Sequence, residues 1–294
     1  MEDISHIPVL KEEVLFYLNC EPGKVFVDGT VGGGGHAKAI LEASKPNGIL
    51  VGLDVDEEAL AVAQKNLSLY RERLILKKTN YAKMKEVLEE IGYEKVDGIL
   101  LDLGISSLQL ADPKRGFSLL QTGPLDMRMD KISSLTAYHI VNKWSKWRLK
   151  EIIRQFGEEK WAGRIAQKII ENRPIETTTQ LSQVIASAIP KKYWPRRIHP
   201  ATRTFQALRI VVNKELENLK QFLNQALNLL MPKGRLVIIS FHSLEDRIVK
   251  TAFRVWVEEK KVKLLTKKPI RPSREEIAQN PRSRSARLRA IETI

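Results

Sequence analysis

A run of glycines directly after a short apolar segment constrains the fold of this chain more than any other feature. Residues 24–28 have the pattern of a buried strand, Gly32–Gly35 follow within a few residues, and a helical pattern begins at His36. Glycine lets the backbone approach a ligand closely and adopt positive φ, at an entropic cost that is high for a plain turn. A strand, a glycine-rich loop and a helix in this order are typical of nucleotide-binding α/β folds.

The same alternation of strand and helix continues through the first hundred residues. Strand patterns occur at 24–28, 48–54, 74–78 and 96–102, with helical patterns between them. Strands that alternate with helices indicate a parallel sheet covered on both faces, so the expected fold class is α/β.

From residue 109 to 212 the apolar spacing is helical and no strong strand pattern occurs, which predicts a helical insertion domain after the fourth strand. A helix through Leu230 and a fifth strand at 234–240 follow, and short β segments at 262–266 and 286–292 would complete the sheet. The predicted domains are 1–108 with 213–294, and the insertion 109–212.

Charge is unevenly distributed along the chain, which has 49 Lys and Arg against 35 Asp and Glu. Residues 1–60 carry eleven acids and four bases, whereas 191–214 carry seven bases and no acid, and 260–289 carry eleven bases and two acids. Such basic segments favour a polyanionic partner such as RNA over a merely solvated surface.

Several classes of protein are disfavoured by composition. No apolar run approaches the roughly 18–20 residues of a membrane helix, and the acidic beginning does not resemble a signal peptide. Cys20 is the single cysteine, and no histidine pair has helical metal-ligand spacing. We therefore expect a cytoplasmic protein with no membrane association and no metal requirement.

Asp28 distinguishes between two cofactors. It ends the first strand just before the glycines, where a carboxylate would repel the pyrophosphate of NAD but suit the sulfonium and amino groups of S-adenosylmethionine. Gly32 and Gly34 match the last two glycines of the methyltransferase pattern D-x-G-x-G-x-G, and Thr30 replaces the first. An NAD-dependent dehydrogenase remains the second enzyme interpretation.

Two further residues suit a nucleoside. Asp54 ends the second strand and could accept hydrogen bonds from a ribose diol, although it could instead cap the next helix, a role that Asp56 fits equally well. Tyr81, just after the third strand, could stack on adenine or simply pack in the core.

Asp102 ends the fourth strand and should face the same crevice, because ligands bind at the carboxyl ends of parallel strands. Its carboxylate could accept a hydrogen bond from an exocyclic amine and stabilise the charge that develops during methyl transfer, with Ser106 as a weaker catalytic helper. Amino-methyltransferases often have a D-P-P-Y type motif here, but Leu103, Gly104 and Ile105 replace its last three residues.

Across nearly its whole length the chain resembles the bacterial ribosomal small-subunit RNA (cytosine-N4)-methyltransferase family. The matching stretches are 27–36, 97–107, 115–118, 123–130, 199–206, 239–247 and 280–285. The resemblance implies a Rossmann-like S-adenosylmethionine-dependent methyltransferase sheet with a helical insertion, and as substrate a cytidine in the decoding region of 16S ribosomal RNA. It also implies cofactor contacts at Gly34, Gly35, His36, Asp54, Tyr81, Asp102 and Gln109.

Several basic residues are candidates for holding the RNA of the small ribosomal subunit, although each could instead be structural. They are Arg115, Arg128, His199, Arg203, His242 and Arg247. An RNA-binding or ribosome-assembly protein that holds the cofactor without turnover is a third interpretation. Methylation of a protein or small molecule is a fourth, which the basic segments disfavour.

Overall fold

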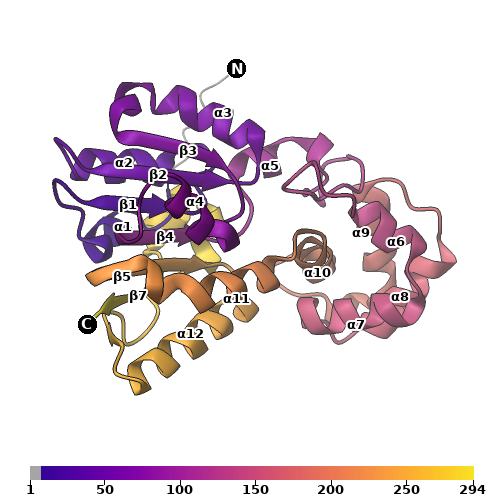
Figure 1. Ribbon diagram of the computed structural model, residues 1–294. Helices are drawn as coiled ribbons and strands as arrows, with labels where there is room; N and C mark the ends of the chain where they lie inside the picture. Colours follow the sequence, from indigo (N-terminus) through magenta and orange to yellow (C-terminus); the bar gives the residue numbers. More distant parts are fainter. Residues whose placement is uncertain (1–7) are drawn as a thin grey trace. The chain divides into compact units, whose positions relative to one another are not determined.

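A computed structural model describes residues 8–294 of the chain, which divides into two compact units (Figure 1). The sheet unit comprises Met1–Gly104 and Leu216–Ile294, and the helical unit comprises Ile105–Glu215. The predicted insertion, 109–212, lies within the helical unit, which begins and ends a few residues outside it.

The sheet unit is built on a seven-stranded sheet with the order β3-β2-β1-β4-β5-β7-β6. The first five strands are parallel, and β7 is antiparallel to both of its neighbours. The mixed α/β architecture expected from the sequence is confirmed. The strands are β1 (Val25–Asp28), β2 (Ile49–Asp54), β3 (Leu74–Lys78), β4 (Val96–Asp102), β5 (Leu230–Ser240), β6 (Val262–Leu264) and β7 (Arg287–Thr293).

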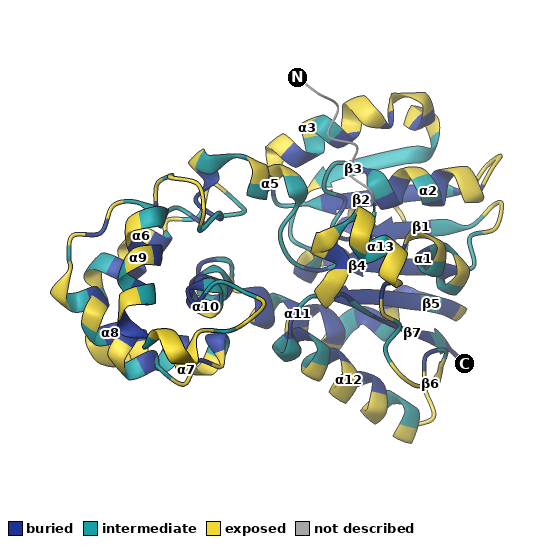
Figure 2. Ribbon diagram, turned by 180° about the vertical axis from the view of Figure 1, so that it is seen from behind, coloured by how far each residue is buried: buried dark blue, intermediate teal, exposed yellow. Residues whose placement is uncertain are grey.

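Helices cover both faces of this sheet because its strands are apolar on both sides (Figure 2). In β5, Leu236 and Ile238 join one buried cluster while Val237 and Ile239 join the other, as the alternation of side chains along a strand requires. Helices α4, α11 and α12 pack in the first cluster, and α1, α2 and α3 in the second. Their bounds are α1 (Lys11–Leu18), α2 (Gly35–Ala43), α3 (Glu57–Asn66), α4 (Met84–Glu90), α11 (Glu215–Ala226) and α12 (Ser243–Glu258).

One predicted boundary is wrong. Helix α11 ends at Ala226, and β5 begins at Leu230, where the sequence pattern predicted a continuing helix. Leu230 pairs with Val96 of β4 and is buried. The leucine that continued the helical spacing therefore belongs to a buried strand. A register shift between Val96 and Gly98 then lets the strand resume regular pairing.

The helical unit has its own apolar core, drawn from α6 through α10. Side-chain oxygens of Thr136, Ser145 and Thr177 accept backbone hydrogen bonds at the beginnings of α6, α7 and α9. Gly157 allows α7 to approach α10, since a Cβ there would lie 2.7 Å from the Arg203 carbonyl oxygen. The helices are α5 (Ser107–Ala111), α6 (Ala137–Lys143), α7 (Lys146–Gly157), α8 (Ala162–Glu171), α9 (Thr178–Ala188) and α10 (Thr202–Asn213).

The last helix of the chain is α13 (Arg274–Gln279), where a Glu276 carboxylate oxygen accepts a hydrogen bond of 2.8 Å from the Leu10 amide. Among the helices within residues 8–294, each is too short or too polar to cross a membrane.

Candidate active site

Three carboxylates end three neighbouring strands at one edge of the sheet. Asp28, Asp54 and Asp102 are the last residues of β1, β2 and β4. Asp28 pairs in register with Gly52 on one side and Leu100 on the other, so the three strand ends meet. The structure therefore brings together the residues that the sequence predicted at the carboxyl end of the sheet.

Asp28 is almost completely buried, with 1% of its surface exposed. Its Oδ1 accepts a hydrogen bond of 3.1 Å from the Thr30 amide, while Oδ2 has no hydrogen-bond partner among the described residues. Burial raises the pKa of Asp28 to about 6, because a carboxylate loses its hydration there. A positively charged ligand group would favour the ionised form.

Asp54 holds the glycine loop against the second strand. Its Oδ2 accepts a hydrogen bond from the Gly32 amide and its Oδ1 one from the Asp56 amide, both of 2.9 Å. Burial raises the pKa of Asp54 to about 6. Asp56, not Asp54, caps α3, by accepting a hydrogen bond from the Glu58 amide. The capping alternative for Asp54 is thus wrong, because both of its carboxylate oxygens accept amides outside α3.

The glycines shape the loop in two ways. Gly34 has φ of +89° just before α2, a backbone conformation that would be strained in a residue with a side chain. At Gly29 a Cβ would lie 2.4 Å from a methyl of Leu101. The loop consequently follows the ends of β1 and β4 closely, with Gly32 bonded to Asp54 and Gly35 beginning α2.

His36 and Asp102 form the most unusual pair at this edge. His36 lies buried in the first turn of α2, and neither ring nitrogen has a hydrogen-bond partner among residues 8–294. Its Nε2 is 3.6 Å from Asp102 Oδ2, and Asp102 Oδ1 also lacks a partner in the part of the chain that the structure describes. Buried polar atoms are nearly always hydrogen-bonded, so these atoms point to a ligand that completes the site.

Thr30 is a residue that the sequence reasoning treated only as a departure from the motif. Its hydroxyl oxygen accepts a hydrogen bond of 2.7 Å from the Asp102 amide and lies 3.4 Å from Asp28 Oδ1. Thr30 therefore links the ends of β1 and β4. The sequence signal for this role is the hydroxyl of Thr30, which stands where the motif has a glycine without a side chain.

Tyr81 opens a short 3₁₀ turn after β3. Its ring meets Phe222 edge to face, with centroids 5.9 Å apart, and it packs against the core while staying partly accessible. Core packing therefore accounts for one side of the ring, and adenine stacking stays a prediction.

Ser106 and Gln109 belong to the helical unit, where they form a capping box at the beginning of α5. Ser106 Oγ accepts from the Gln109 amide, and Gln109 Oε1 accepts from the Ser106 amide, each at 3.1 Å. These bonds explain both residues structurally. Their predicted roles in catalysis and cofactor binding stay predictions.

Two of the arginines suggested for RNA are used inside the helical unit. Arg115 is buried, and its guanidinium donates to the carbonyls of Arg128 and Met129. Arg128 pairs with both oxygens of Asp126 at 2.8 Å and also donates to carbonyls of the same loop. This geometry favours a role in stabilising the loop rather than a contact with a phosphate.

The remaining candidates differ in exposure. His242 is buried and caps α12 in a capping box with Glu245, whereas Arg247 is exposed on the same helix. In the helical unit, His199 is partly buried, which lowers its pKa, and Arg203 is exposed with Nη1 3.8 Å from Glu159. Arg203 and Arg247 are therefore the more accessible candidates for RNA contact.

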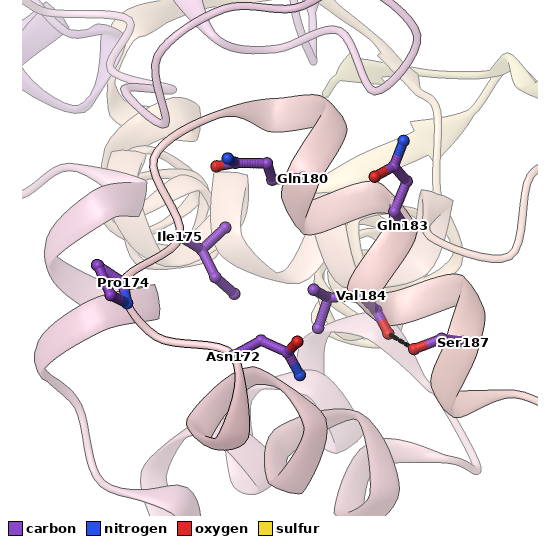
Figure 3. A pocket seen from close by; sticks show the side chains of 7 residues that line it. All are labelled: Asn172, Pro174, Ile175, Gln180, Gln183, Val184 and Ser187. Atoms are coloured by element: carbon purple, nitrogen blue, oxygen red, sulfur yellow. Dashed lines mark hydrogen bonds between the residues drawn. The ribbon is translucent and has the colours of Figure 1, made fainter.

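The helical unit also has a pocket of about 400 Å³ beside α9 (Figure 3). Its lining is neutral, and Gln180 already accepts the amides of Glu176 and Thr177. None of the lining side chains is an acid or a base, and the hydroxyl of Ser187 donates a hydrogen bond to the Val184 carbonyl. The lining residues are Asn172, Pro174, Ile175, Gln180, Gln183, Val184 and Ser187.

Comparison with known proteins identifies close relatives of the whole chain. The family model described as the MraW methylase family matches residues 3–294. A Pseudothermotoga lettingae protein named "Ribosomal RNA small subunit methyltransferase H" is 52% identical, covering 99% of each chain. A Syntrophus aciditrophicus protein of the same name is 51% identical over 98% of each chain. Among solved structures, an rRNA methylase from Streptococcus thermophilus has a TM-score of 0.45 at 12% identity, covering 97% of this chain and 93% of that one.

Proposed function

Because this chain belongs to the MraW methylase family, we propose that it transfers a methyl group from S-adenosylmethionine to N4 of a cytidine in the decoding region of 16S ribosomal RNA. The observation that carries the proposal is a group of buried polar atoms on Asp28, His36 and Asp102 at the carboxyl end of the sheet, which form no hydrogen bond with any described residue. Such a site suits a ligand that is both cationic and rich in hydrogen-bonding groups.

The residues at the strand ends fit this cofactor. Asp54 would accept hydrogen bonds from the ribose diol, and Asp28 and His36 would face its charged amino-acid portion. The backbone of Gly32 and Gly34 leaves room for close approach, and Tyr81 would stack on the adenine. When bound, the cofactor supplies an electrophilic methyl group on sulfur.

Asp102 is the residue that we propose as the partner of the cytosine amine. That amine is a weak nucleophile, because its lone pair is delocalised into the ring. A carboxylate that accepts its N–H concentrates electron density on N4 and stabilises positive charge as the new N–C bond forms. From Pro8 to the last residue, no group forms a hydrogen bond with Asp102 Oδ1, and the Thr30 hydroxyl fixes the backbone of Asp102.

The base must leave its stack before its amine can reach a carboxylate at the sheet edge. Arg203, Arg247 and His199 are the proposed RNA contacts with the most accessible side chains. His242, Arg115 and Arg128 contribute through the loops that they hold. The proposed setting is the cytoplasm, where ribosomal RNA is the polyanion that the basic segments would meet, and no step requires a metal.

The test follows tritium from labelled S-adenosylmethionine into small ribosomal subunits that lack the modification. Wild type should yield N4-methylated cytidine, whereas Asp102→Ala should lose about 10²–10³-fold in rate at saturating cofactor. Asp112→Ala, which removes a carboxylate that accepts the Lys114 amide in the helical unit, is the matched control. Cofactor binding without any labelling of subunits or free RNA would favour a non-catalytic RNA-binding protein.

A further inference from the structure

A short segment of the helical unit combines exposed aromatic rings with positive charge. We call residues 191–199 the aromatic–basic loop. Tyr193 and Trp194 are 54% and 37% exposed, although large aromatic side chains are usually covered. The 3₁₀ turn Lys191–Tyr193 begins the loop, and prolines at 190, 195 and 200 restrict its backbone.

Both rings are exposed but held in place. The Trp194 indole N–H donates a hydrogen bond of 2.9 Å to the Ile189 carbonyl. The Tyr193 ring lies with its centroid 5.3 Å from that of Trp161, and the Lys192 ammonium lies 5.1 Å from the Tyr193 centroid. These contacts fix the planes of the rings, which would lower the entropic cost of stacking a planar partner on them.

The surroundings of the rings are positively charged. Lys191, Lys192, Arg196 and Arg197 are exposed, and no acidic residue occurs from 191 to 214. The Arg164 guanidinium lies 5.2 Å from the Trp161 centroid and extends the same row of cations and rings.

We propose that the aromatic–basic loop is a stacking platform for single-stranded RNA, on which Tyr193 and Trp194 hold unpaired bases while the neighbouring cations contact phosphates. Aromatic rings beside a track of cations bind single strands with little dependence on base identity. Sequence-specific RNA recognition also generally needs bases that are splayed out of a duplex. The inference rests on the proposed function, because the RNA that this surface would hold is the proposed substrate.

An anionic membrane is the other surface that aromatic and basic side chains could meet. Insertion into a membrane depends on buried apolar area. Between residues 190 and 200 the large apolar side chains that are exposed are Tyr193 and Trp194 alone, and both carry polar groups. Flat, fixed rings without exposed aliphatic neighbours favour stacking over insertion.

The first test measures binding of the full chain to a fluorescein-labelled single-stranded RNA of twelve mixed nucleotides. Tyr193→Ala and Trp194→Ala should each weaken binding by about 5- to 50-fold, the range expected for loss of one stacked base. Tyr193→Phe and Trp194→Phe should stay within about threefold of wild type, because they keep a ring. Tyr138→Ala, which removes a 37% exposed ring from α6, is the matched control and should leave affinity unchanged.

Salt dependence separates the charges from the rings. The double variant Arg196→Ala/Arg197→Ala should reduce the slope of log affinity against log salt by about 1–2, whereas Lys65→Ala/Lys85→Ala in the sheet unit should not change it. Wild-type affinity in both alanine ring variants would overturn the proposal. So would a Trp194→Phe variant as weak as Trp194→Ala, or binding to phosphatidylglycerol vesicles in place of RNA. Failure of wild type to label ribosomal subunits would contradict the proposed function instead, and RNA affinity would still decide the role of the loop.

Discussion

Two buried histidines follow strands of the same sheet and differ in what surrounds them. His36 comes after β1, in the first turn of α2, and His242 comes after β5, just before α12. His242 Nδ1 accepts from the Glu245 amide at 3.4 Å, and Nε2 lies 3.2 Å from Glu245 Oε1. Within residues 8–294, both ring nitrogens of His36 lack a hydrogen-bond partner, whereas His242 lacks one only at Nε2.

The difference separates a side chain that supports the fold from one that is prepared for a ligand. The carboxylate of Glu245 also accepts the amides of Phe241 and His242, so residues of the β5–α12 turn hold one another in place. Around the β1–α2 loop, atoms of Asp28, His36 and Asp102 lack hydrogen bonds to the described residues, which costs free energy unless a ligand supplies the missing bonds. Changes at the first loop should therefore affect binding, and changes at the second should affect stability.

The largest effect is expected from Asp54. Asp54→Ala removes the proposed ribose contact and the acceptor for the Gly32 amide, so S-adenosylmethionine affinity should fall by about 100-fold or more. Asp56→Asn is the control, because asparagine caps a helix as well as aspartate does, and it should bind within about threefold of wild type. Isothermal titration calorimetry measures both. Equal losses in the two variants would mean that loop geometry, not the Asp54 contact, determines affinity.

The next effect concerns stability without ligand. The pKa of Asp28 is about 6 in the fold and about 3.9 in an unfolded chain, so the protonated carboxyl stabilises the fold. This contribution is complete below about pH 4 and is lost as pH rises through about 6. Asp28→Asn should therefore match wild type near pH 4 and be more stable by about 3 kcal/mol at pH 7. Urea unfolding at several pH values measures this, and a less stable variant at pH 7 would contradict it.

Cofactor binding should show the opposite pH dependence. A cationic ligand requires Asp28 ionised and a ribose diol favours ionised Asp54, and both pKa values are about 6. Affinity should be constant above about pH 7 and fall by up to about tenfold per pH unit for each carboxylate below 6. Calorimetry from pH 5 to pH 8 tests this, with the Asp28→Asn variant expected to give a shallower profile. Affinity that rises toward pH 5 would show that these carboxylates do not meet the cation.

The smallest effect is expected at the second histidine. His242→Ala removes the cap of α12 and should lower the free energy of unfolding by about 1 kcal/mol, while cofactor affinity stays unchanged. His242→Asn retains a capping acceptor and should recover most of the stability. Thermal unfolding combined with calorimetry distinguishes the cap from a ligand-binding role.

Much of the sheet could be predicted because its apolar runs are bounded by clear breaks. The three aspartates were identifiable since each ends such a run, and parallel strands bring their carboxyl ends together. The end of the helix was predicted wrongly at Leu230, because a leucine there fits both a helix and a buried strand. Only its pairing with Val96 distinguishes the two.

Side-chain partners could not be predicted from the same patterns. Arg115 and Arg128 have the charge expected of RNA contacts, but their guanidinium groups donate to carbonyls of their own loop. These bonds depend on the tertiary structure and have no pattern in the sequence. Thr30 looked like a defect in a glycine motif until its hydroxyl was seen to accept the Asp102 amide. The distinction between His36 and His242 likewise depends on distances that no spacing in the sequence encodes.

The most direct test of this account is a calorimetric titration of S-adenosylmethionine into wild type, His36→Ala and His242→Ala at pH 7.5. If the β1–α2 loop is the ligand site, His36→Ala should bind about tenfold or more weakly and unfold at nearly the wild-type temperature, whereas His242→Ala should bind normally and unfold earlier. Unchanged affinity in His36→Ala, or a loss of affinity confined to His242→Ala, would contradict it.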